Sequence, residues 1–97
     1  MPNYIITEKA LEDINAIWQY TAENWSIEQA NRYYNLLLDE IEYIAQNYTM
    51  ARDFGNIRKS YRCSKVNSHL IFFKRNNQHQ IEVIRVLHER MDIKNKI

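Results

Sequence analysis

Two stretches in the C-terminal half, His69-Leu70-Ile71-Phe72-Phe73 and Ile81-Glu82-Val83-Ile84-Arg85-Val86-Leu87, decide the fold predicted for this chain. Both are rich in β-branched and aromatic residues, and both place apolar side chains on each of the two faces of a strand. Strands of this kind lie in the middle of a sheet that is covered on both sides. The sequence therefore predicts two central strands with cover above and below them.

Turn residues around these stretches extend them into a meander. A preceding strand is predicted from Lys59 to Val66, where apolar and polar residues alternate loosely. Asn67-Ser68 turns the chain into the next strand, because asparagine tolerates a positive φ. Arg75-Asn76-Asn77-Gln78 supplies the second turn. Three antiparallel strands in sequence order follow from this pattern.

The N-terminal half has the spacing of helices. Tyr4-Ile5-Ile6 is a short β-prone strand, and Thr7 is placed as the N-cap of a helix whose apolar stripe runs from Ala10 to Thr21. A second stripe runs from Ala30 to Tyr48. The break at Asn24-Trp25-Ser26 is short, so the two helices should fold back as an antiparallel hairpin.

The second helix has a start signal of its own. Ser26 followed three residues later by Gln29 has the pattern of a capping box. The tyrosines of this helix are expected to be mostly core residues whose hydroxyls reach the surface, and Trp18 lies on the buried stripe of the first helix. Trp25 lies in the turn, where packing against the core is favoured over anchoring a partner.

The element order is therefore β-α-α-β-β-β, a helical hairpin packed on one sheet in an α+β domain. A chain of 97 residues has the length of one domain, so residues 1–97 are expected to form a single domain. The residues between the helices and the meander, 49–57, are expected to be a connecting loop. Because the hairpin covers only one face of the sheet, a tail or another chain is needed on the other.

Several classes of protein are excluded by composition. Cys63 is the only cysteine and cannot form an internal disulfide, so it is expected to be inert packing. The N-terminus has neither the basic nor the apolar region of a signal peptide, and no apolar run approaches the roughly 20 residues of a membrane span. A soluble cytoplasmic protein is expected.

No metal or cofactor is predicted. His69, His79 and His88 are scattered, and no CxxC or HxxxH spacing occurs. A chain with one glycine has no glycine-rich phosphate loop.

The charge is divided unevenly between the two halves. Residues 1–48 have two basic and eight acidic side chains, a net charge of −6, whereas residues 49–97 have eleven basic and four acidic, a net charge of +7. Such a division steers charged partners to one side of a molecule. The same division also arises when helices are rich in glutamate and strands are rich in arginine, without any partner. Charge alone favours neither interpretation.

One kind of enzyme is compatible with the residue types. RNA cleavage through the 2′-hydroxyl needs a base, an acid and cations, but no metal. The candidates are Tyr61, Arg62, Arg85 and His88, all in the basic half. The competing interpretation is that Tyr61 packs, the arginines are paired or solvated, and His88 only ends a strand.

A family resemblance rests on the later part of the chain. The chain resembles the ParE branch of the RelE/ParE toxin superfamily in two stretches. The first is Tyr61-Arg62 followed by Ser68-His69-Leu70-Ile71-Phe72-Phe73. The second runs from Ile81 to Asp92 and contains the block Arg85-Val86-Leu87-His88-Glu89-Arg90-Met91-Asp92. The resemblance extends to the opening Tyr4-Ile5-Ile6-Thr7 and to Trp25-Ser26 before the second helix. It departs at residues 49–56, where relatives often have a proline and a Gly-Arg pair.

The resemblance implies the toxin of a type II toxin–antitoxin pair, a plasmid-stabilisation and growth-inhibition system. It implies a cognate antitoxin of the ribbon-helix-helix type, whose disordered tail folds onto the toxin in a hetero-oligomer, and DNA gyrase as the target, inhibited by binding and not by catalysis. An acidic tail would suit both the uncovered sheet face and the basic half. The alternatives are a ribosome-dependent messenger-RNA endonuclease of the RelE type and a binding module without toxicity.

The same resemblance implies the residues that bind the target or the antitoxin, and it implies no catalytic residue. These residues are Arg62, His69, Arg85, His88, Arg90, Met91 and Asp92. Arg62 and Arg90 have guanidinium groups suited to carboxylates, and Met91 offers an adaptable apolar contact. Arg85 and Asp92 are equally compatible with a structural role at the end of the last strand.

Overall fold

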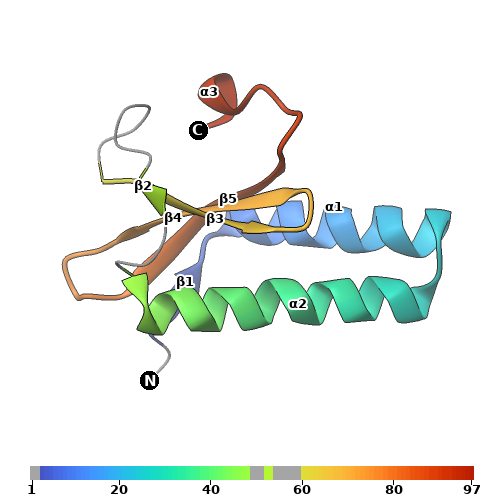
Figure 1. Cartoon of the computed structure of the whole chain (residues 1–97), viewed down its shortest axis with the longest axis horizontal. Coiled ribbons are helices and arrows are strands. Elements are labelled where there is room, and N and C mark those ends of the chain that lie inside the picture. The colour runs from blue at the N-terminus through green and yellow to red at the C-terminus, as the bar shows by residue number, and fades with distance from the viewer. Residues whose placement is uncertain (1–2, 49–51, 54–59) are drawn as a thin grey trace.

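The computed structural model describes residues 3–48, 52–53 and 60–97, and it has a helical hairpin on one face of a five-stranded sheet (Figure 1). The elements are, in chain order, β1 (Tyr4–Ile6), α1 (Glu8–Asn24), α2 (Ile27–Gln46), β2 (Arg52–Asp53), β3 (Arg62–Val66), β4 (His69–Arg75), β5 (Ile81–His88) and α3 (Ile93–Lys96). The predicted β-α-α-β-β-β order and the α+β class are confirmed.

The sheet has the order β1-β5-β4-β3-β2 and is mixed. β3, β4 and β5 form the predicted antiparallel meander, in which Ile71 lies opposite both Ser64 and Val86. β1 pairs in parallel with β5, with Tyr4 opposite Ile81, so the first strand of the chain lies beside the last. Asn67, at the turn between β3 and β4, has the expected positive φ of 52°.

Thr7 joins β1 to α1 and both of them to the sheet. Its Oγ1 accepts a hydrogen bond from the Ala10 amide at 3.2 Å, which is the predicted N-cap, and donates one to the Ile84 carbonyl at 3.3 Å. Its own amide donates to the Val83 carbonyl. In α2 the Ser26 hydroxyl accepts from the Gln29 amide at 3.0 Å, as the capping pattern predicts.

Two apolar clusters lie on opposite faces of the sheet. The larger, between the sheet and the helical hairpin, contains Ile14, Leu37, Ile41, Ile71 and Phe73, all almost completely buried. The smaller contains Cys63, Leu70, Phe72 and Leu87, with Ile93 and Ile97 packed against it. The cover required on the second face is thus supplied by the C-terminal tail, since α3 lies across the sheet from the hairpin (Figure 1).

The structure corrects two predicted elements. Residues 49–57, expected to be a connecting loop, include the short strand β2, whose Arg52 pairs with Cys63. The rest of that interval lies outside the described residues, as does Lys59, and the strand predicted from Lys59 begins at Arg62. A two-residue strand has too few side chains to produce an alternating pattern, so the sequence did not reveal it.

Leu37 and Leu36 are neighbours in α2 with opposite environments, since Leu37 is 0% exposed and Leu36 is 46% exposed. We expect Leu37→Ala to lower the free energy of unfolding by about 2–5 kcal/mol, because it leaves a cavity in the larger cluster. Leu36→Ala should change it by less than about 0.5 kcal/mol. Urea unfolding of both variants measures the difference, and equal losses would contradict the placement of α2 on the sheet.

Candidate functional site

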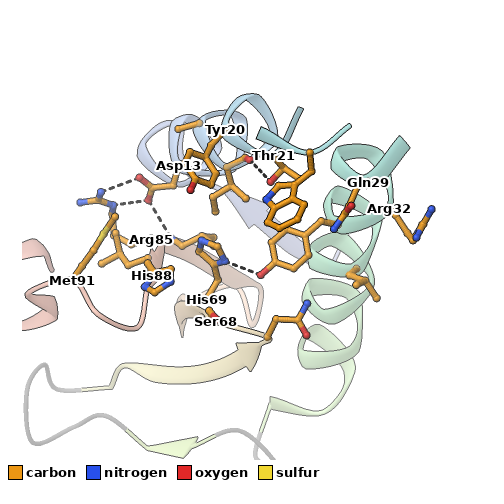
Figure 2. A pocket seen from close by; sticks show the side chains of 18 of the residues that line it. Asp13, Tyr20, Thr21, Gln29, Arg32, Ser68, His69, Arg85, His88 and Met91 are labelled. Carbon is orange, nitrogen blue, oxygen red and sulfur yellow. Dashed lines mark hydrogen bonds and ion pairs between the residues drawn. The ribbon is translucent and has the colours of Figure 1, made fainter. Parts of the chain in front are cut away.

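An open groove of about 900 Å³ lies between the helical hairpin and the end of the sheet at which β5 finishes (Figure 2). The second half of α1 and the first half of α2 form its helical wall. The turn between β3 and β4, the end of β5 and the residues that follow form its other walls. The groove therefore combines segments from the acidic and the basic halves of the chain.

Large apolar side chains are exposed along this groove. Trp25 is 70% exposed and Tyr20 64% exposed, and Leu36 and Met91 are each about half exposed. Exposed aromatic and methionine side chains gathered in one concave surface are typical of a protein-binding site. Trp25 was expected to pack in the core, and that prediction is wrong, because the turn between α1 and α2 extends past the end of the sheet and leaves the side chain exposed (Figure 1).

Tyr33 and His69 form a hydrogen-bonded pair within the groove, and the ring of His88 lies against that of His69. The Tyr33 hydroxyl donates to the Val66 carbonyl at 2.9 Å and lies 2.7 Å from Nδ1 of His69. With the hydroxyl hydrogen on Val66, this contact fits the His69 tautomer that has its hydrogen on Nδ1. The ring of His88 lies edge-on to that of His69, with centroids 5.3 Å apart, and its Nδ1 accepts from the Arg90 amide.

Burial shifts the pKa values of Tyr33 and His69. It raises the pKa of Tyr33 to about 12 and lowers the pKa of His69 below its ordinary value. The charge of His88 lowers the pKa of His69 further, while Glu89 partly opposes this effect. Glu89 is itself paired with Lys65 at 2.8 Å, and the hydrogen bond from Lys65 lowers the Glu89 pKa. Tyr33 and His69 are consequently uncharged at neutral pH.

Arg85 and Asp13 form a two-pronged ion pair beside the groove (Figure 2). Nε of Arg85 lies 2.7 Å from Oδ2 of Asp13, and Nη2 lies 2.9 Å from Oδ1. The same carboxylate accepts from the Val86 amide at 3.0 Å, and Nη1 of Arg85 donates to the Lys96 carbonyl at 3.1 Å. Both side chains are only 14% exposed, and the hydrogen bond with Asp13 raises the pKa of Arg85.

Four of the seven residues predicted to bind the target or antitoxin line the groove: His69, Arg85, His88 and Met91. The other three do not. Arg90 is exposed beyond the end of β5, and Asp92 precedes α3, where its Oδ2 accepts from the Asn95 side chain at 2.6 Å. Arg62 lies at the start of β3 with its guanidinium 4.7 Å from the centroid of the Tyr48 ring.

The four ribonuclease candidates are not gathered in one place. Arg62 lies opposite Phe73 in β4, whereas His88 lies opposite His69. Four residues of strand separate these positions, which is roughly 13 Å along β4. Arg85 and His88 line the groove, but neither Tyr61 nor Arg62 does.

Sequence reasoning missed several residues of the groove, above all Tyr20, Arg32, Leu36 and Asp13. Tyr20 and Leu36 interrupt the polar surface of a helix, and single exposed apolar residues are common enough to carry no signal alone. Arg32 is a single charge on an exposed helix face, which is equally common. Only the folded hairpin brings them beside the end of β5. Among the residues that the structure describes, no three His, Cys, Asp or Glu side chains are grouped as a metal ion would require, and no helix combines the length and apolar character of a membrane span.

The fold has a counterpart of known structure. A chain from a structure titled as the chromosomal ParDE TA system from P. aeruginosa superimposes with a TM-score of 0.77, covering 88% of this chain and 92% of that one at 15% identity. This likeness establishes a shared fold, a small α+β domain.

Sequence comparison establishes the family. Residues 4–93 match the sequence model described as the ParE toxin of the type II toxin–antitoxin system parDE. A protein named Toxin ParE1 from Caulobacter vibrioides is 35% identical over 92 residues, covering 95% of this chain and 94% of its own length. A Toxin ParE1 from Mycobacterium tuberculosis is 33% identical over 90 residues, covering 93% and 92%. The chain belongs to the ParE toxin family of type II toxin–antitoxin systems.

The lowered pKa of His69 makes stability depend on pH. An unfolded histidine takes up a proton near pH 6.5, whereas folded His69 resists protonation until a lower pH, so the unfolded chain binds more protons in this range. We expect the free energy of unfolding to fall as the pH is lowered from about 7.5 to 5. Urea unfolding at both pH values should show a smaller fall for His69→Gln; an identical fall would exclude His69 as its source.

Proposed function

We propose that this ParE-family toxin is neutralised by a cognate antitoxin whose tail occupies the groove, and that the free toxin inhibits DNA gyrase by binding it. The observation that carries the first part is the groove itself, with its exposed Trp25, Tyr20, Leu36 and Met91. Such a surface on a small protein is energetically unfavourable in water, and covering it stabilises a complex.

Charge favours an acidic occupant. The groove is lined by the basic side chains of Arg32, Arg85 and Lys96 and by a single carboxylate, Asp13, which is already paired with Arg85. A disordered tail that combines apolar and acidic residues would cover the aromatic side chains and meet Arg32 and Lys96. In this proposal the antitoxin is of the ribbon-helix-helix type, and the two proteins form a hetero-oligomer in the bacterial cytoplasm.

The arrangement of polar groups favours inhibition by binding over catalysis. The guanidinium of Arg85 is held by Asp13 and the Lys96 carbonyl, so it is engaged with the protein's own groups. Tyr33, with a pKa of about 12, is poorly suited to proton transfer near neutral pH. The separation of Arg62 from His88 leaves the RelE-type ribonuclease as the less favoured alternative.

Trp25 is the residue on which we expect antitoxin binding to depend most. Trp25→Ala should weaken binding of the antitoxin encoded beside this chain's gene by roughly 30-fold, the effect of losing a buried aromatic contact. Tyr43→Ala removes an aromatic side chain that is 51% exposed and lies outside the groove, and it should leave the affinity unchanged. Isothermal titration of the three proteins measures this, and equal affinities for both variants would contradict occupation of the groove.

The target is tested by two assays on the purified chain. We expect loss of supercoiling by purified gyrase with accumulation of cleaved DNA, intact messenger RNA in a translating extract, and full activity of Tyr61→Phe, because a binding inhibitor does not use that hydroxyl for proton transfer. Cut messenger RNA with normal supercoiling would identify a RelE-type ribonuclease. No response in either assay, with normal growth on induction, would identify a binding module without toxicity.

A further inference from the structure

Two arginines of the sheet stack on one aromatic ring at the far end of α2. The guanidinium carbon of Arg75 lies 4.3 Å from the centroid of the Tyr48 ring, and that of Arg62 lies 4.7 Å from it. Tyr48 directly follows Asn47, which caps the C-terminus of α2. We call this group of three residues the arginine–tyrosine platform.

The register of the sheet explains why the two arginines meet. Arg62 lies opposite Phe73 across β3 and β4, and Arg75 is two residues beyond Phe73 on the same strand, so all three side chains project from one face. Phe73 is completely buried and contacts the Tyr48 ring edge-on, with centroids 6.0 Å apart. The ring is therefore fixed from the core side, and it in turn holds the planar guanidinium groups.

The platform concentrates positive charge at the surface. Arg75 is exposed, and among the described residues the ion pairs use Lys65, Lys74 and Arg85 as their cations, so Arg75 is in none of them. Both guanidinium groups remain charged at any pH at which the protein is folded. A surface of this kind attracts an anion with several charges.

The platform and the groove are on different parts of the molecule. The groove uses the first half of α2, whereas Tyr48 lies just beyond the C-cap of this helix, and a helix of 20 residues is about 30 Å long. The end of α2 that leads to β2 lies opposite the turn between α1 and α2 (Figure 1). Neither the aromatic wall of the groove nor its polar residues extend to the platform.

We propose that Arg75, held on Tyr48 beside Arg62, binds phosphate groups of the backbone of double-stranded DNA. Guanidinium groups donate paired hydrogen bonds to phosphate oxygens, and contacts of this kind are independent of base sequence. The net charge of +7 on residues 49–97 would attract the same polyanion. The use of this contact rests on the proposed function, because gyrase holds duplex DNA and a toxin that touches both would be retained on the gyrase–DNA complex.

Fluorescence anisotropy with a labelled duplex of about 20 base pairs, at salt concentrations from about 50 to 200 mM, tests the platform directly. We expect Arg75→Gln to weaken binding roughly three- to tenfold at low salt and to reduce the slope of log affinity against log salt by about 1, the loss of one phosphate contact. Arg75→Lys should have a DNA affinity between those of the wild-type chain and Arg75→Gln, because lysine keeps the positive charge but lacks the planar guanidinium group that stacks on the ring. Lys9→Gln, which removes one exposed charge from α1, is the matched control and should retain the wild-type slope.

Three outcomes would overturn the proposal: no binding of the duplex by the wild-type chain at about 50 mM salt, equal behaviour of Arg75→Gln and Lys9→Gln, or loss of antitoxin affinity in Arg75→Gln with DNA affinity unchanged. The third would mean that the platform binds carboxylates. The supercoiling assay separates this proposal from the preceding one, because a chain that binds DNA through Arg75 but does not inhibit gyrase contradicts only the choice of target.

Discussion

The ion pair between Asp13 and Arg85 joins the parts of the molecule that have no sequence proximity. One carboxylate on α1 accepts two hydrogen bonds from Arg85 and one from the Val86 amide, and Arg85 reaches on to the Lys96 carbonyl in the tail. The helical hairpin, the last strand and the C-terminal segment are thus fixed against one another. Both side chains are largely buried, so removing either of them should destabilise the fold, because the other would remain as a buried charge without its counter-charge. The groove depends on this interaction, since its two walls are the parts that the pair connects.

The distribution of apolar surface divides the molecule into a structural and an interacting part. Apolar residues of the sheet are covered on one face by the hairpin and on the other by Ile93 and Ile97. The apolar residues at the hairpin turn and next to it are not covered, and Trp25 and Tyr20 are the most exposed of them. A chain this small has little stability to spare, so surface of this kind is expected where a partner binds. The proposed antitoxin site and the proposed DNA contact at Tyr48 would then use opposite ends of α2.

Much of the fold followed from local signals. Continuous apolar runs gave β4 and β5, while Thr7 and Ser26 marked the helix starts because a hydroxyl satisfies an amide that the helix leaves unpaired. β2 is two residues long, and the parallel pairing of β1 with β5 spans almost the whole chain; neither leaves a pattern in nearby residues. For the site, the resemblance picked out His69, Arg85, His88 and Met91, all of which line the groove. Trp25 was assigned to the core, because an aromatic side chain in a short turn has the same sequence signature whether it packs inward or outward.

The sequence by itself determined the first strand, the two long helices and the meander, with their order, the two-sided burial of the central strands and the family, since these depend on residue type and spacing along the chain. Only the tertiary structure decided which charges are paired, which tyrosine meets which histidine, and that Arg62 and Arg75 share the ring of Tyr48. Contacts of that kind join residues tens of positions apart, and their existence depends on strand register and on the direction of each side chain. A shift of one residue in register would move every such side chain to the other face of the sheet.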